Sequence, residues 1–354
     1  MTSINAIRFD FFSGAMVCDE QRHWNPERLK IFAADKIRPV VPLDIAGKYR
    51  TVAAYGNTGT SSIGDELRHT IGRNVASRFE EMTRVSGREP ERFLTIEDIA
   101  ALTFDTILAL KHQHTDDHLL AKYGFNTRDF IRGKISAPPG QGDPIPLTNE
   151  HLLNQAHTEI SFTPDKTGNH PVFGNAGILA GFDPQNGFQI YLFSMRQFFW
   201  EPVHIGFVAQ GSGSDTANIV LSHFFNERCI GERTSAVDRV DGLIAILSGV
   251  TTAMLNNLGV GGYFNILLFD GRADHPELML RQINDHRSRL GTELVMAHDA
   301  SLVSYPLLRE LIDGMFFENK GIDWAEERLW SSVASPLRLH RFLRGYPGCV
   351  NGKM

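Results

Sequence analysis

The stretch from 176 to 194 limits the fold more than any other: two apolar runs, AGILAGF and FQIYLFS, flank the turn sequence DPQNG. Apolar β segments joined by a short turn rich in Pro, Asn and Gly predict an antiparallel hairpin. A third apolar run follows at 203 to 209. We expect all three to be core strands of a sheet.

The N-terminal residues predict a second hairpin, formed by 2 to 9 and 15 to 18. Apolar residues fall on both faces of its first strand, so we expect layers to cover the strand on both sides and Thr2 to lie at the edge of a rigid core. A further strand at 49 to 55 should lead through a tight turn, Gly56 to Gly64, into a helix near 63 to 82.

Several helices are predicted from capping residues and apolar spacing. Thr95 with Asp98 forms a capping pair that starts a helix ending near Lys111. A pair of helices should start at about Asp215 and at Ser235, where Asp238 completes a second capping pair. The remaining expected elements are a short helix at 149 to 157, a strand at 263 to 269, and helices at 276 to 290, 305 to 318, 323 to 331 and 336 to 344.

Strands without regular βαβ alternation, together with paired helices, predict an α+β fold in which helix pairs lie on antiparallel sheets. Segments rich in Pro, Gly and Asp predict an inserted excursion at about 120 to 175. We therefore expect a core at 1 to 272 that contains this excursion, and a helical C-terminal extension at 273 to 354.

Composition excludes several classes of protein. The chain has 354 residues, of which 42% are hydrophobic, enough for a substantial core, and its net charge of −6 argues against nucleic acid as a main partner. Its three cysteines, Cys18, Cys229 and Cys349, have neither disulfide-framework nor zinc-site spacing. The sequence shows no signal peptide and no membrane span, so we expect a cytoplasmic protein.

Several short segments occur in a definite order along the chain. They are CDEQR at 18 to 22, DKIRPV at 35 to 40, VAAYGNTG at 52 to 59, GILAGFDPQNGFQIYLF at 177 to 193, GSGSDTA at 211 to 217, and the GVGG before the strand at 263, and Thr2 precedes them all. In this order the sequence resembles, over roughly residues 2 to 270, the proteasome β-subunit and its bacterial relatives of the N-terminal-nucleophile (Ntn) hydrolase superfamily. Thr2 stands where the family carries its catalytic threonine.

The resemblance implies a four-layer αββα sandwich and a set of catalytic residues. Thr2 corresponds to the nucleophile, Asp19 and Lys36 to the family's buried aspartate and lysine, and Gly56 to the glycine whose amide forms the oxyanion hole. Ser212 corresponds to the serine of the Gly-Ser-Gly turn. The family implies no cofactor and no metal.

The chemistry of Thr2 is reasonable apart from the resemblance. A threonine with a free α-amine carries a nucleophile and a base in one residue, because an α-amine with a pKa of about 7.7 to 8.0 can accept the hydroxyl proton near neutral pH. This requires removal of Met1. A nearby ammonium from Lys36 would stabilise the developing alkoxide, and Asp19 would keep that ammonium charged and oriented.

The sequence departs from the family at two supporting positions. Asn257 and Val260 stand where the family has an aspartate and a serine. The alternative to a threonine hydrolase is therefore a catalytically inactive, proteasome-like scaffold subunit that keeps the fold for assembly.

A second alternative comes from the segment HQHTDDH. His112, His114 and His118 suggest a metal-dependent hydrolase, but the spacing is one residue too long for the metallo-β-lactamase ligand run, and the segment follows a helix instead of a strand. A solvated helix end is the competing interpretation.

The family resemblance points to an amide substrate, most simply a peptide, although an amidase or a transpeptidase would use the same residues. It also implies self-association into a ring-like or stacked homo-oligomer. Neither nucleic acid nor a membrane is an expected partner.

Overall fold

The computed structural model describes residues 2–24, 29–32, 35–135, 143–160, 173–194, 199–229, 236–257 and 260–343. Two five-stranded antiparallel sheets form its centre. The predicted α+β class with antiparallel sheets is therefore confirmed. None of the described helices is both long and apolar enough to cross a membrane.

The first sheet has the strand order β12-β1-β2-β13-β14. Its strands are β12 (Phe207–Gly211), β1 (Ser3–Arg8), β2 (Ser13–Asp19), β13 (Phe264–Asp270) and β14 (Leu280–Ile283). The expected N-terminal hairpin is confirmed, since Ile4 pairs with Cys18 and Arg8 with Gly14. Residues 3 to 7 of β1 are buried, as expected for a strand covered on both faces, and every residue of β2 is buried as well.

The second sheet has the order β11-β10-β9-β6-β5. Its strands are β11 (Phe199–Pro202), β10 (Gly187–Ser194), β9 (Ala176–Asp183), β6 (Val52–Thr58) and β5 (Ile37–Pro39). The predicted hairpin around DPQNG is confirmed by the pairing of Gly187 with Asp183. Two small hairpins stand apart from these sheets: β3 (Gln21–Trp24) with β4 (Leu29–Phe32), and β7 (Lys134–Ile135) with β8 (Ile145–Pro146).

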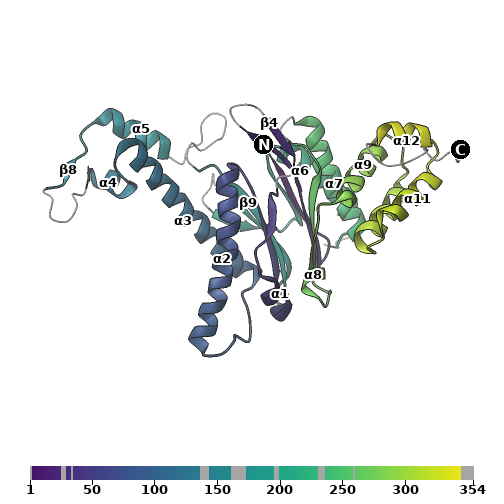
Figure 1. Cartoon of the computed structure of the whole chain (residues 1–354), viewed down its shortest axis with the longest axis horizontal. Coiled ribbons are helices and arrows are strands. Elements are labelled where there is room, and N and C mark those ends of the chain that lie inside the picture. Colours follow the sequence, from purple (N-terminus) through teal and green to yellow (C-terminus); the bar gives the residue numbers. More distant parts are fainter. Residues whose placement is uncertain are drawn as a thin grey trace.

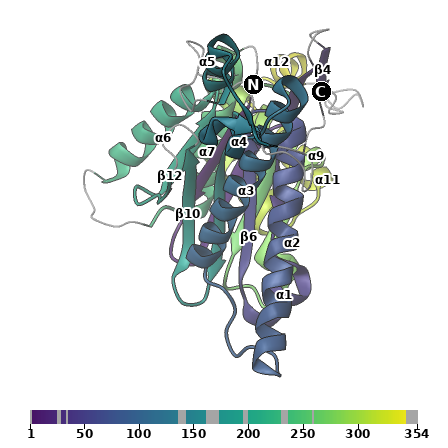
Figure 2. The same cartoon turned by 90° about the vertical axis from the view of Figure 1, so that its left-hand side faces the viewer.

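The two sheets pack face to face, and helices cover their outer faces (Figures 1 and 2). Side chains of β1 and β2 alternate between two cores. Ile4, Ala6, Met16 and Cys18 pack toward the second sheet, whereas Ile7 and Val17 belong to the core under α7. Helices α2 (Ser61–Ser86) and α3 (Ile96–Tyr123) lie on the second sheet, and α6 (Ser214–Cys229) and α7 (Arg239–Asn256) on the first.

Three boundaries differ from the sequence prediction. Gly56 lies inside β6 and not in a turn, because β6 continues to Thr58 and the turn is made by Gly59, whose φ is +110°. The strand expected at 203 to 209 starts only at Phe207, after a turn at Gly206 with φ +85°. Helix α7 begins at Arg239, because the Asp238 side chain accepts hydrogen bonds from Val240 N and Asp241 N; Ser235 lies outside the described residues.

Helix α3 starts as predicted and runs further than predicted. Thr95 and Asp98 form a reciprocal capping box. The helix passes Lys111 and ends only at Gly124, which has φ +77°. Its C-terminal half, with α4 (Thr127–Arg132), the β7–β8 hairpin and α5 (Glu150–Ile160), forms the excursion that projects from the sheets in Figure 1.

The C-terminal part is mainly helical, with one correction. The helix expected at 276 to 290 is wrong: α8 (Pro276–Met279) is one short turn, and β14 then pairs with β13 through Ile283 and Ile266. The described helices after β14 are α9 (His286–Asp299), α10 (Tyr305–Ile312) with the π-helical turn η1 (Asp313–Phe317), α11 (Ile322–Ser332) and α12 (Pro336–Phe342). The short helix α1 (Leu43–Tyr49) precedes β6.

Candidate active site

Thr2 lies immediately before β1, at the end of the first sheet where β12 turns into α6. It is buried, with 8% of its surface exposed. Its backbone nitrogen donates to Ser212 Oγ at 3.2 Å, and its carbonyl oxygen lies 3.5 Å from Gly213 N. Gly211, at φ +109°, allows this close approach, because a Cβ at that position would overlap the Thr2 carbonyl group.

Asp19 and Lys36 form a buried ion pair beside this strand end. Lys36 Nζ donates to Asp19 Oδ1 at 2.7 Å, and the two side chains are 6% and 0% exposed. Asp19 ends β2, whereas Lys36 directly precedes β5, so the pair connects the two sheets. A buried charge is stable only when it is compensated and hydrogen-bonded, as it is here.

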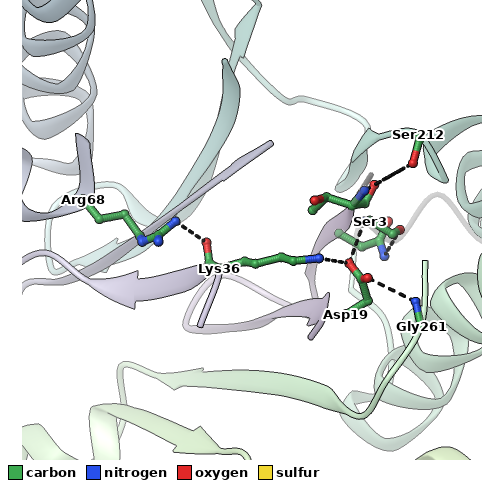
Figure 3. Close-up of polar contacts among 8 residues, drawn as sticks. Ser3, Asp19, Lys36, Arg68, Ser212 and Gly261 are labelled. Atoms are coloured by element: carbon green, nitrogen blue, oxygen red, sulfur yellow. Dashed lines mark hydrogen bonds and ion pairs between the residues drawn. The ribbon is translucent and has the colours of Figure 1, made fainter. Parts of the chain in front are cut away.

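Two backbone amides complete the environment of the Asp19 carboxylate (Figure 3). Ser3 N donates to Oδ1 at 2.8 Å, and Gly261 N donates to Oδ2 at 3.1 Å. Asp19 therefore joins the backbone of β1 next to Thr2, the lysine before β5, and the loop before β13. The pairing of a carboxylate with Lys36 keeps the lysine tip beside the first residues of β1.

Asn257 holds the backbone of Ser212. Asn257 Nδ2 donates to the Ser212 carbonyl oxygen at 2.7 Å. The neutral amide thus positions the Ser212 backbone without adding a charge. Val260 is buried, and its amide donates to Asn257 O at 3.0 Å, directly before the Gly261 amide that reaches Asp19.

Gly56 lies opposite Ile37 in the second sheet, and a Cβ at Gly56 would come within 2.6 Å of Ile37 Cγ2. Its backbone faces away from β5. Val40 N donates to Ala53 O at 2.9 Å, and antiparallel alternation from that pair directs the Gly56 amide toward Ile178 of β9. The oxyanion role of Gly56 stays a prediction, and the site geometry described above does not depend on it.

Arg68 and Asn57 were missed by the sequence analysis. Arg68, on α2, donates from Nη1 to the Lys36 carbonyl oxygen at 3.2 Å and also to Asn57 Oδ1. Its Nη2 pairs with Asp65, and its side chain is 3% exposed. The available signal was helical spacing: Arg68 interrupts the buried stripe of α2 that contains Gly64, Ile71 and Val75.

Burial shifts the pKa of several groups around the pair. Desolvation raises the pKa of the Cys18 thiol, which disfavours its thiolate. Desolvation, followed by the nearby carboxylates of Asp19 and Asp35, raises the pKa of Glu20. Desolvation also lowers the pKa of Arg68, although the neighbouring Asp65 opposes this effect. The region thus concentrates ionisable groups in a poorly hydrated place.

The histidine-rich segment lies within α3 and not at a helix end. His114 Nε2 is 2.7 Å from Glu66 Oε2 on α2, and His112 is exposed. Within the described residues, no three His, Cys, Asp or Glu side chains are grouped to hold a metal ion.

The structure therefore brings Thr2, Asp19, Lys36 and Ser212 together, with Gly56 in the facing sheet beside the start of β5. Comparison of the sequence with models of known protein families gave no match, and comparison with curated proteins gave none either.

Proposed function

We propose that this chain is an N-terminal threonine amidohydrolase of the proteasome-like Ntn type, built on a four-layer αββα sandwich and acting on peptides. The observation that carries the proposal is the convergence of four separate chain segments on Thr2 and the buried Asp19–Lys36 pair. A buried charge pair beside a hydroxyl residue at the end of a strand can stabilise the charge that develops on that hydroxyl during a reaction.

The proposed nucleophile is Thr2 Oγ, and the proposed base is the α-amine of the same residue. In the structure Thr2 N is a peptide nitrogen that donates to Ser212 Oγ. Once every preceding residue is removed, this nitrogen becomes an amine that also accepts a proton. Ser212 then holds the amine in place, and the Asn257 amide holds Ser212.

Lys36 has an electrostatic role in this mechanism. Its ammonium, fixed by Asp19, favours the unprotonated α-amine and the developing alkoxide through its positive charge. Because the pair is buried and held in place before the reaction, little reorganisation is needed when charge develops on Thr2 Oγ.

The reaction proceeds in two balanced stages. The amine takes the hydroxyl proton as Oγ bonds to the amide carbon, and the proton then passes to the leaving nitrogen when the C–N bond breaks. The product is an ester on Thr2. Water then adds to this ester while the same amine accepts its proton. When the C–O bond breaks, the amine returns that proton to Oγ, which releases the acid and restores Thr2.

The test is the intact mass of the protein before and after incubation with a peptide epoxyketone. Thr2 Oγ adds to the ketone and the α-amine opens the epoxide, so the adduct adds the whole mass of the probe. We expect loss of Met1 and one adduct per chain in the wild type, a slower adduct with Thr2→Ser, and none with Thr2→Ala. Retained Met1 would refute the mechanism.

A catalytically inactive scaffold is the second candidate, and the neutral Asn257 in place of a carboxylate favours it. This candidate predicts that a chain whose Thr2 is already N-terminal forms no adduct at all. It also predicts that Thr2→Ala changes neither folding nor assembly. Assembly into a ring-like or stacked homo-oligomer and a cytoplasmic location stay predictions.

A further inference from the structure

We propose that Arg68 is a positioning residue for the reaction: it fixes the backbone of Lys36 while Asp19 fixes its ammonium. This inference rests on the proposed threonine hydrolase function and adds a residue that the sequence resemblance does not contain. Figure 3 shows Lys36 extended between the two contacts, with Arg68 at the carbonyl end and Asp19 at the Nζ end.

Lys36 lies just outside the second sheet, directly before Ile37, where β5 begins. A side chain that leaves the end of a three-residue strand needs another anchor if its tip is to be held accurately. Arg68 supplies that anchor from α2.

Asn57, on β6, shares the Arg68 guanidinium with Lys36. Extending the β5–β6 register by one residue places Lys36 opposite Asn57, and Arg68 Nη1 donates to both: to the Lys36 carbonyl oxygen at 3.2 Å and to Asn57 Oδ1. Asn57 is 5% exposed and packs so closely on α2 that a Cβ on Gly64 would overlap its amide. One guanidinium therefore connects helix α2 with Asn57 on β6 and with the backbone of Lys36 at the start of β5.

The surroundings of this side chain require an arginine at position 68. The side chain is 3% exposed, its Nε has no hydrogen-bond partner among the described residues, and desolvation lowers its pKa. Burying a cation with an unsatisfied nitrogen is unfavourable. The hydrogen bonds of Arg68 to Lys36 and Asn57 offset this loss of hydration. A lysine has no planar fork with which to reach both acceptors and Asp65.

The test measures the rate of epoxyketone adduct formation at saturating probe, kinact, and the half-saturating concentration, KI. In Arg68→Lys and Arg68→Gln we expect kinact to fall by about 10- to 100-fold, because small misplacements of a catalytic group have this effect. KI should change little, since Arg68 does not contact the substrate. Arg73→Gln, an exposed arginine on the same helix, is the control and should match the wild type.

A double-mutant cycle separates positioning from loss of fold. Asn57→Ala removes one acceptor and keeps the arginine. Because both substitutions break the same contact, the loss of kinact in the double variant with Arg68→Lys should be smaller than the sum of the two single losses in free energy. In Arg68→Ala, added methylguanidinium should restore part of kinact, whereas a lost fold would not respond.

The outcomes are distinct. A wild type with N-terminal Thr2 that forms no adduct overturns the proposed function and this inference with it. A reactive wild type whose Arg68 variants are folded by circular dichroism and react at the wild-type rate overturns only the inference. Additive effects of Asn57→Ala and Arg68→Lys also overturn it.

Discussion

Asp19 illustrates how one side chain can hold a site together. Its two oxygens accept hydrogen bonds from Ser3 N, Lys36 Nζ and Gly261 N, and none of its surface is exposed. Its carboxylate thus supplies the acceptor for three buried donors. Removing it would leave a buried ammonium and two buried amides to find new partners.

We predict that Asp19→Ala lowers the free energy of unfolding by about 3 to 5 kcal/mol, because one partner of a buried pair is lost while the other remains buried. Urea denaturation followed by circular dichroism measures this. Glu91→Ala, which removes a partner of the exposed Arg88–Glu91 pair, is the control and should cost less than about 1 kcal/mol. Equal effects in both variants would contradict the prediction.

Lys111 makes stability depend on pH. It is a buried residue of α3, and desolvation lowers its pKa from 10.5 to about 7. Between these values the unfolded chain binds a proton that the folded chain does not, so this lysine makes stability rise with pH across that window, by at most about 1.4 kcal/mol per unit, and level off below it.

We expect Lys111→Met to be more stable than the wild type near pH 8 and to have a flatter pH dependence, because it lacks the group that must lose its proton on folding. Urea denaturation at intervals between pH 7 and 9.5 gives both slopes. Lys122→Met, on the exposed side of the same helix, should keep the wild-type slope. A wild-type slope in Lys111→Met would show that Lys111 is not the group responsible.

At the scale of elements, the predictions that succeeded had local physical causes. The hairpin around DPQNG and the capping box at Thr95 are determined by residues a few positions apart. The failures depend on distant contacts. β14 is four residues long and is a strand only because β13 offers an open edge, and the end of α3 is set by Gly124, because the polar HQHTDDH segment contains no residue that stops a helix.

The same distinction applies to the candidate site. Thr2, Asp19, Lys36 and Ser212 could be found from the order of short motifs, and the structure brings them together. Arg68 could not be assigned a partner from sequence, because its contacts with Lys36 and Asn57 exist only once α2 packs on the β5–β6 edge.

Capping gives a direct test at this scale. Thr95→Ala removes the side chain that caps α3, and we expect the free energy of unfolding to fall by about 0.5 to 2 kcal/mol. Thr60→Ala is the matched control: Thr60 precedes α2 but makes no side-chain capping hydrogen bond, so its replacement should cost less than about 0.5 kcal/mol. Equal losses in the two variants would argue against the capping box.

At the scale of the whole molecule, the C-terminal helices share a core with the first sheet. One continuous hydrophobic cluster contains Ile7 and Val17 of the N-terminal hairpin, Leu247 of α7, and Leu308 and Leu329 of the C-terminal helices. In Figure 1 these helices lie against the α7 side of the sheets. Each part covers apolar surface of the other, which favours cooperative unfolding.

We therefore predict a single unfolding transition. In a variant with Trp24→Phe and Trp200→Phe, fluorescence reports only Trp324 and Trp330, which pack against this shared cluster. Its urea midpoint should coincide with that of the far-ultraviolet circular dichroism of the whole chain. An earlier fluorescence transition would show that the C-terminal helices unfold independently.

The hydrogen bond from Gly261 to Asp19 spans 242 residues of sequence. During synthesis Asp19 leaves the ribosome well before Gly261, whose amide completes the Asp19 environment. Closing so long a loop requires the intervening strands to be in place. The buried environment of Asp19 is thus completed long after Asp19 itself is made, and a chain that ends before Gly261 lacks one of the three donors that hold this carboxylate.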